Sequence, residues 1–229
     1  MHALTNLALA TGSFVGTHLI LSHPLRAPLV ARLGARGFLG LYSVIAFATL
    51  GWTVLAFRAA PPAPLLWIAP ESAWHIASVV MLIAAILLVG SLIGNPAAVD
   101  PTGTLEVPET ARGVYAVTRH PMMWSILLWA LIHATLWPAP RTLVLTAGIG
   151  LLALAGAWGQ DAKKARLVGA PWRDWQARTS FIPFAALLGG RANWRALWPG
   201  AVPVLGGLAL WIGATWAHPL LVGPWLWTG

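Results

Sequence analysis

"WHIASVVMLIAAILLVGSLIG", residues 74–94, contains no aspartate, glutamate, lysine or arginine. A helix that crosses a bilayer needs about 20 consecutive, mostly apolar residues, so this segment predicts a membrane-spanning helix. The sequence contains five other apolar segments of comparable length. They lie at about residues 3–22, 38–57, 121–137, 141–159 and 201–217. The sequence therefore predicts an all-α polytopic membrane protein, built as a bundle of about six transmembrane helices.

The overall composition supports the same fold class. Of the 229 residues, 58% are hydrophobic and only 9% are charged, whereas about a quarter of the residues in an ordinary soluble domain are charged. No linker or change of composition divides the chain, so we expect a single integral membrane domain over residues 1–229. The chain has no cysteine, which excludes disulfides, thiolate metal ligands and a cysteine nucleophile among these residues.

The basic residues indicate how the helices are oriented. The formal net charge is +8, but its distribution follows membrane topology and argues against a nucleic-acid partner. If the six segments alternate across the bilayer, 12 of the 14 lysines and arginines fall on one side, which the positive-inside rule assigns to the cytoplasm. We therefore expect a multi-pass protein of the bacterial inner (plasma) membrane, in contact with membrane lipid and with both termini periplasmic. The 12 residues are Arg26, Arg32, Arg36, Arg112, Arg119, Lys163, Lys164, Arg166, Arg173, Arg178, Arg191 and Arg195.

The segment at about residues 160–195 is predicted to lie on the cytoplasmic side, because it follows the fifth apolar segment and is rich in basic residues. Its first part has the pattern of a basic amphipathic helix. We expect Trp172 and Trp175 to insert into the membrane interface, while Arg173 and Arg178 remain in water.

Histidine is the most informative residue type for function. An ionisable side chain inside a membrane span is a functional candidate, and the acidic residues all lie in predicted loops. His18, His75, His120 and His133 lie in predicted spans or at their ends. Neutral imidazole is the commonest metal ligand, and a haem held between helices can be bound by histidines alone. The alternative is that each ring packs in the bundle and donates one hydrogen bond to a nearby carbonyl.

The other three histidines are not expected to be ligands. His2 is at the N-terminus, His23 lies where the first predicted helix leaves the membrane, and His218 follows the last predicted span. The chain also has no C-x-x-C-H motif, so any haem is expected to be bound non-covalently.

Spacing along the helix limits which histidines can share an iron. His120 and His133 are roughly 20 Å apart at 1.5 Å per residue, so they cannot bind the same iron atom. Depth in the bilayer instead pairs His18 with His120, and His75 with His133. This pairing would allow two stacked haems, although the offset of roughly 140° between His120 and His133 around the helix argues against a simple coaxial pair. We expect one haem b and leave a second open.

Two stretches in the second half of the chain resemble a known family. They are "GVYAVTRHPMMWSILLWALIHATLW", residues 113–137, and "GAWGQDAKKARLVGAPWRDWQARTSFIPFAAL", residues 156–187. Both are similar to the C-terminal half of the NnrU family, whose superfamily includes the plant and bacterial zeta-carotene isomerases. "AWHIASVVMLIAAILLVGSLIGNPAAVDP", residues 73–101, and "THLILSHPLRAPLVARLGARGFLGLYSV", residues 17–44, extend the resemblance to nearly the whole chain up to about residue 195.

In the isomerase branch, the resemblance implies a multi-pass protein that binds haem b and converts the central cis double bond of zeta-carotene to trans. His133 falls on a haem ligand of that branch and is the first candidate metal ligand; His18 falls on the second. His75 and His120 match other histidines of the family and are alternative ligands. The plant isomerase has a cysteine at about Ala130 of this chain, so thiolate ligation is not expected here.

The NnrU branch implies a different role, because its members are linked to denitrification and support nitrite and nitric oxide reductase activity. Haem binding is therefore compatible with a cis–trans isomerase of a membrane-soluble polyene, or with a protein that takes electrons from a donor or senses nitric oxide. Arg119 is a candidate partner for a haem propionate at the cytoplasmic face. The alternative is that its positive charge only helps to set the membrane topology. A haem-free reductase assembly factor is a third alternative.

A membrane methyltransferase is the last alternative. "RHP", residues 119–121, followed by a helix and a basic segment, resembles the isoprenylcysteine carboxyl methyltransferases. Those enzymes use this histidine and a later pair of glutamates around S-adenosylmethionine, whereas Gln160 and Asp161 occupy the corresponding positions here. We therefore interpret the resemblance as common ancestry with loss of that cofactor site.

Overall fold

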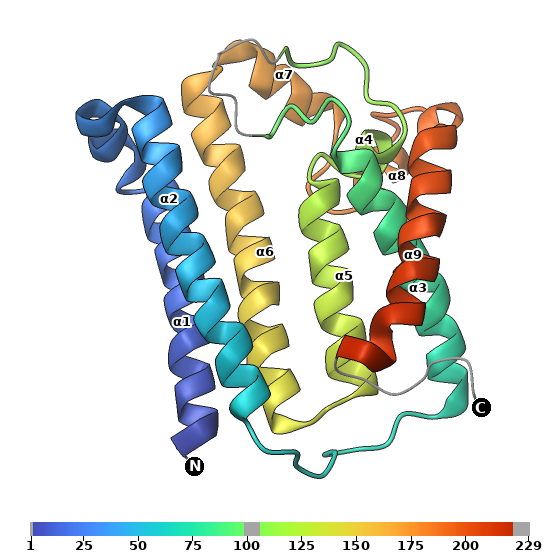
Figure 1. Ribbon diagram of the computed structural model, residues 1–229. Helices are drawn as coiled ribbons and strands as arrows, with labels where there is room; N and C mark the ends of the chain where they lie inside the picture. Colours follow the sequence, from blue (N-terminus) through green and yellow to red (C-terminus); the bar gives the residue numbers. More distant parts are fainter. Residues whose placement is uncertain (1, 99–105, 222–229) are drawn as a thin grey trace.

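The computed structural model describes residues 2–98 and 106–221, and this part of the chain is helical, without strands. Six long helices dominate it (Figure 1). They are α1 (His2–Ser22), α2 (Arg26–Ala59), α3 (Glu71–Ser91), α5 (Pro121–Leu136), α6 (Pro140–Leu167) and α9 (Ala201–Leu221). Each of them coincides with one of the six predicted segments, which confirms the all-α polytopic fold class.

The surfaces of these helices are those of a membrane protein. Five of the six are long and apolar enough to cross a membrane, and α5 is equally apolar but has only 16 residues. On α2, large apolar side chains such as Val44, Phe47 and Leu55 are more than two-thirds exposed. Soluble proteins rarely expose apolar surface on this scale, so lipid is the solvent that accounts for it.

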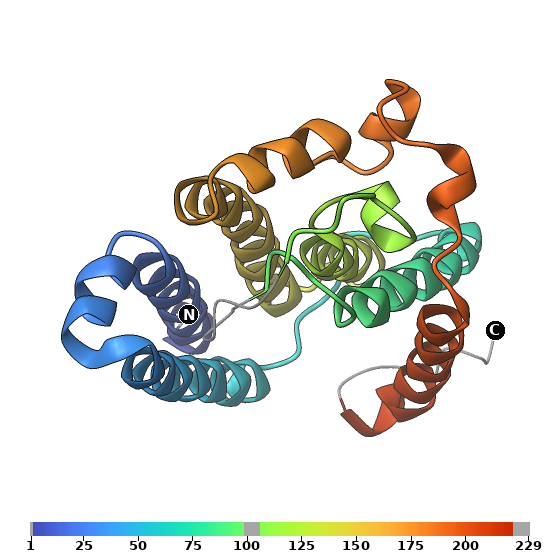
Figure 2. The ribbon, with the colours of Figure 1, turned by 90° about the horizontal axis from the view of Figure 1, so that it is seen from above.

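Helix α2 begins twelve residues before the predicted span 38–57, at Arg26. The basic stretch between the first two predicted spans is helical, with a break at Gly34, where φ is 71° and ψ is 167°. Glycine adopts positive φ at little cost because it has no Cβ. The helix therefore bends at this residue, and its short basic part turns away from the long apolar part (Figure 2).

The long helices pack in a fixed order. Helix α1 packs on α2 and α6, α5 packs on both α6 and α3, and α9 packs on α3. The bundle is thus a curved row in the order α2, α1, α6, α5, α3, α9, as Figure 2 shows from above. Helix α5 joins the two halves of this row.

Four short helices cover one end of the bundle (Figure 1). They are α4 (Val114–Val117), α7 (Ala170–Arg178), α8 (Ala185–Leu188) and the 3-10 helix η1 (Trp194–Leu197). We call these helices and their loops, residues 106–120 and 168–200, the cap. The Thr118 hydroxyl donates to the carbonyls of Ser180 and Phe181, at 3.1 and 2.7 Å, and so ties the two parts of the cap together. The cap lies at the end predicted to face the cytoplasm.

The two tryptophans of α7 overturn one expectation. Trp172 and Trp175 are both 0% exposed and belong to a cluster with Leu87, Val114 and Tyr115. The prediction that they insert into the membrane interface is therefore wrong. Amphipathic periodicity shows that one face of a helix is apolar, but it does not show whether lipid or protein covers that face. Here α3 and α4 cover it.

A close approach between α3 and α9 depends on glycine. A Cβ at Gly207 would lie 2.8 Å from the backbone nitrogen and Cα of Ile86. Because backbone atoms cannot move aside as a side chain can, we expect Gly207→Ala to destabilise the protein by about 1–3 kcal/mol. The measurement is the midpoint of unfolding by SDS in detergent micelles. Gly213→Ala, in the same helix with open space around it, is the matched control, and equal midpoints for the two variants would contradict this packing.

Candidate functional site

The predicted site residues do not form one cluster. His18 lines a groove between α1, α2, α5 and α6, and His133 faces α9. Arg119 and His120 lie in the cap, and His75 is on the surface at the start of α3. We describe these places in turn.

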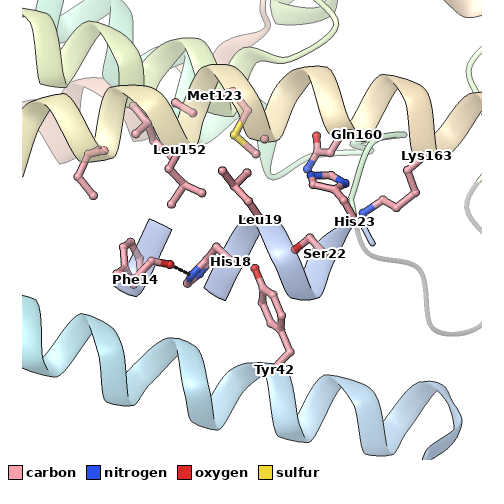
Figure 3. Close-up of a pocket in the computed structure, with 14 residues that line it drawn as sticks. Phe14, His18, Leu19, Ser22, His23, Tyr42, Met123, Leu152, Gln160 and Lys163 are labelled. Atoms are coloured by element: carbon pink, nitrogen blue, oxygen red, sulfur yellow. Dashed lines mark hydrogen bonds between the residues drawn. The ribbon is translucent and has the colours of Figure 1, made fainter. Parts of the chain in front are cut away.

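The groove has a volume of about 330 Å³ (Figure 3). Its walls are mostly apolar and include Met123 and Ile126 of α5 and Leu152 of α6. The His18 ring projects from α1 and lies against Tyr42 of α2, with ring centroids 5.2 Å apart. A groove of this size and character suits part of an extended apolar molecule.

The tautomer of His18 follows from its hydrogen bond. Its Nδ1 lies 2.9 Å from the carbonyl oxygen of Phe14, one turn earlier in α1. A carbonyl oxygen only accepts, so Nδ1 must carry the proton and donate it. The lone pair of the neutral ring is then on Nε2, the nitrogen that a metal or a proton donor would meet.

The end of the groove next to the cap is polar. His23, Gln160 and Lys163 line it (Figure 3), and the His23 ring lies where a side chain on residue 159 would stand, a space left open by Gly159. Burial lowers the pKa of His23, and the positive charges of Lys163 and Arg166 lower it further. His23 is therefore neutral at pH 7. Sequence reasoning set His23 aside as an interfacial residue.

His133 lies near the end of α5. Its Nδ1 is 2.8 Å from the carbonyl oxygen of Trp129 and donates to it, so its Nε2 also carries the lone pair. The ring lies over Trp129, with centroids 4.5 Å apart. The ring of His218 of α9 is its other ring neighbour, with centroids 6.1 Å apart and an angle of 35° between the planes.

His218 was excluded from the candidate ligands because the predicted last span ended at residue 217. Helix α9 continues to Leu221, with Pro219 inside it, so His218 is part of the membrane helix. The rule that an ionisable residue inside a span is a functional candidate would have identified it, had the span been drawn four residues longer.

The structure does not bring His18 and His133 together. His18 is four residues before the end of α1, and His133 is twelve residues after the start of α5. Because α1 ends and α5 begins at the same end of the bundle (Figure 1), the depths of His18 and His133 differ by roughly 12 Å. Helix α5 connects His133 with the groove that His18 lines. Ile126 lines this groove, and His133 follows it by seven residues, so the two side chains point within about 20° of the same direction from α5. His133 therefore continues the α5 wall of the groove about 10 Å further from the cap.

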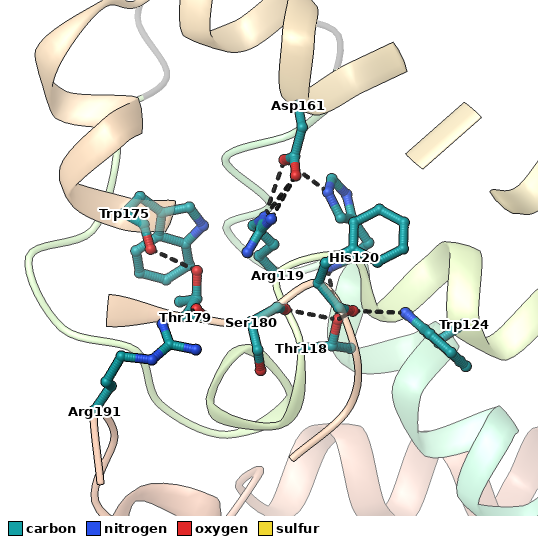
Figure 4. A network of polar contacts seen from close by, with 10 residues as sticks. Thr118, Arg119, His120, Trp124, Asp161, Trp175, Thr179, Ser180 and Arg191 are labelled. Atoms are coloured by element: carbon teal, nitrogen blue, oxygen red, sulfur yellow. Dashed lines mark hydrogen bonds and ion pairs between the residues drawn. The ribbon is translucent and has the colours of Figure 1, made fainter. Parts of the chain in front are cut away.

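Arg119 and His120 form a buried ion cluster with Asp161 of α6 (Figure 4). Arg119 donates from Nε and Nη2 to the carboxylate, at 2.6–3.0 Å, and His120 Nε2 lies 2.9 Å from Oδ1. Phe181 packs against His120 edge to face. The cluster connects the first residues of α5 to α6 and to the cap. Arg119 was predicted to bind a haem propionate or only to help set the membrane topology. In the structure its partner is the carboxylate of Asp161.

His75 stands apart from the other candidates. Its side chain is 80% exposed and lies 3.9 Å from Glu71, one turn earlier in α3. The depth argument paired it with His133, whose ring faces α9 instead. Within residues 2–98 and 106–221, no three or more histidine, aspartate or glutamate side chains converge as a metal site.

Comparison with known proteins identifies relatives of this chain. A family model described as "NnrU protein" matches residues 6–226. The protein described as "15-cis-zeta-carotene isomerase, chloroplastic" from Arabidopsis thaliana is 39% identical over 116 residues, which are 48% of this chain and 31% of that protein. The protein of the same description from Zea mays is 35% identical over 114 residues, again 48% and 31%. The chain thus aligns with less than a third of the length of these relatives, and no solved structure matches it.

Proposed function

Since the chain belongs to the NnrU protein family, we propose that it is a cis–trans isomerase of a hydrophobic polyene in the plasma membrane, with haem b bound through His133. The observation that carries this proposal is the apolar groove, whose α5 wall leads along one helix face to His133. The similarity to plant proteins described as zeta-carotene isomerases supports the choice of substrate class.

The groove has the properties that a polyene requires. Its walls between α1, α5 and α6 are apolar, and the helices around it expose apolar side chains to lipid. A molecule dissolved in the bilayer can therefore enter without passing a polar surface. At about 330 Å³ the groove is near the lower limit of ligand pockets, roughly 300–1,000 Å³, so it takes only part of a long polyene. The remainder of the substrate stays in lipid.

Cis–trans isomerisation leaves the composition of the substrate unchanged, so the side chains must hold the polyene and exclude water without donating or removing atoms. Met123, Ile126 and Leu152 meet this need, because none of them carries an acidic proton or a charge. The positive charge of Lys163 is confined to the polar end of the groove, and the neutral ring of His23 adds no second charge there.

The hydrogen bond that His133 makes is the kind that a metal-binding histidine makes. Metal-binding histidines generally donate their second ring N–H to a carbonyl or carboxylate, which fixes the tautomer and the orientation of the ring. The bond from Nδ1 to the Trp129 carbonyl does this for His133, and the apolar ring of Trp129 lies beside it. Haem, when bound, would supply a redox-active iron. We also propose that the cap lies in the cytoplasm and that both termini are periplasmic.

The first test is the optical spectrum of the detergent-purified protein. We expect a Soret band and sharp reduced α and β bands, and we expect His133→Ala to lose them because the ligand nitrogen is gone. His75→Ala, which removes an exposed histidine, is the control and should keep the spectrum. A wild-type protein without visible bands would rule out the haem.

The second test is activity on a polyene. In cells that accumulate a 15-cis polyene, co-expression of the chain should yield the trans product. Ile126→Trp, which fills the groove from α5, should lower the yield and leave the visible spectrum unchanged. A spectrum with haem bands and no change in the polyene would instead favour the role in denitrification.

A further inference from the structure

Positive charge gathers at the polar end of the groove. Lys163 of α6 lines this end and is half-buried, and the charges of Arg26 and Lys164 repel its own. The guanidinium of Arg26 lies 5.8 Å from the ring centroid of Phe38, and Phe38 packs on Tyr42 of the groove wall. Helices α2 and α6 thus both bring a basic side chain to the same opening.

Acidic side chains do not balance these charges in the described part of the chain. Lys163 and Arg26 form no ion pair with a carboxylate of residues 2–98 or 106–221. The acid nearest to Lys163 along α6 is Asp161, which is bound to Arg119 and His120. Taking a charge out of water is unfavourable unless an opposite charge pairs with it. An anion at this opening would therefore be held by the protein.

The opening lies at the depth that lipid headgroups occupy. Lys163 is four residues before the end of α6, and Arg26 is the first residue of α2. Both helix ends lie at the same end of the bundle as the cap (Figure 1). From there the groove continues between apolar side chains to Leu152 (Figure 3). Leu152 is roughly 16 Å from Lys163 along α6, about half of the 30 Å hydrocarbon core, so the groove spans one leaflet.

We propose that the groove binds an anionic phospholipid of the surrounding membrane, with its phosphate at Lys163 and Arg26 and one acyl chain between α1, α5 and α6. Ammonium and guanidinium groups both form charge-assisted hydrogen bonds to phosphate, and the neutral ring of His23 can donate one N–H. Basic openings between membrane helices are known to bind acidic headgroups. This site goes beyond the proposed isomerase function and requires no haem. The lipid chain fills the groove until a polyene displaces it.

The test measures which lipid stays bound to the detergent-purified, full-length protein, by native mass spectrometry. Phosphatidylglycerol and phosphatidylcholine with identical chains are added in equal amounts; both carry a phosphate, but only the first has a net negative charge. We expect the wild type to retain at least about fivefold more phosphatidylglycerol, and Lys163→Gln to lower this preference about fivefold, the effect of one basic residue near a headgroup. Arg173→Gln removes the same charge from an exposed position of α7. It is the matched control and should keep the preference.

Three further measurements complete the test. Arg26→Gln covers the case in which Lys163→Gln does not fold, and it should also lower the preference. Ile126→Trp, which fills the groove from α5, should lower the amount of phosphatidylglycerol retained. Excess inorganic phosphate should not displace the lipid, because the acyl chain contributes to binding.

Four results would overturn the inference. They are equal retention of the two lipids by the wild type, equal effects of Lys163→Gln and Arg173→Gln, unchanged retention by Ile126→Trp, and displacement of the lipid by phosphate alone. The haem spectrum is measured separately, so a protein without haem that still selects phosphatidylglycerol would contradict the proposed function and leave this lipid site in place.

Discussion

Asp161→Ala is expected to destabilise the protein by about 3–5 kcal/mol, because it leaves the buried charge of Arg119 without its partner. The guanidinium and the carboxylate are each only 11% exposed. The His120 ring, which is buried in the cap, would also lose its hydrogen bond to Oδ1. The measurement is the free energy of unfolding by SDS in detergent micelles, or the thermal midpoint by circular dichroism.

Two further variants isolate the cause. Asp174→Ala removes the same charge from the exposed face of α7 and should change the stability by less than about 0.5 kcal/mol. Replacing both members of the pair, with Arg119→Met and Asp161→Leu, should recover part of the loss, because the double variant has no unpaired buried charge. Equal effects of Asp161→Ala and Asp174→Ala would show that the cluster does not hold the cap to α6.

Trp172→Ala is the second variant with a large expected effect, about 3–5 kcal/mol of lost stability. The side chain is 0% exposed and belongs to the cluster that joins α7 to α3 and α4. Its removal leaves a cavity that the surrounding helices can fill only in part. Hydrogen exchange should show the loss first in α7 and α4.

Trp158→Ala is the control for this variant. Trp158 is 75% exposed on α6, within the region that lipid surrounds, so its replacement removes few protein contacts. A loss of stability as large as that of Trp172→Ala would show that the lipid-facing tryptophan contributes as much as the buried one. Insertion of Trp172 into the membrane, as the sequence suggested, predicts small effects for both.

The helical segments could be predicted because they follow from local properties of the chain. The length and apolarity of residues 74–94 are sufficient to place a span, and α3 (Glu71–Ser91) lies there. The ends were less predictable, because a helix can continue into water or into a cap. Thus α2 begins at Arg26 and α9 ends at Leu221, beyond the apolar segments that identify them.

The neighbours of each histidine could not be predicted from spacing. Spacing gives the depth and the direction of a side chain on its own helix, but not which helix packs opposite. The order of the row puts α9 beside α3 and near the end of α5, so His133 meets a residue that the sequence placed outside the membrane. The same limit applies to Asp161, whose sequence position suggested a lost cofactor site and whose partners are Arg119 and His120.

The shortness of α5 has a consequence for the surrounding bilayer. At 1.5 Å per residue this helix is about 24 Å long, whereas the hydrocarbon core of a typical bilayer is about 30 Å thick. Its first residues are covered by the cap, so protein fills the depth that α5 does not reach. The hydrocarbon core beside α5 is therefore shorter than the core beside the long helices α2 and α6. We expect the bilayer to be locally thin on the side of α5.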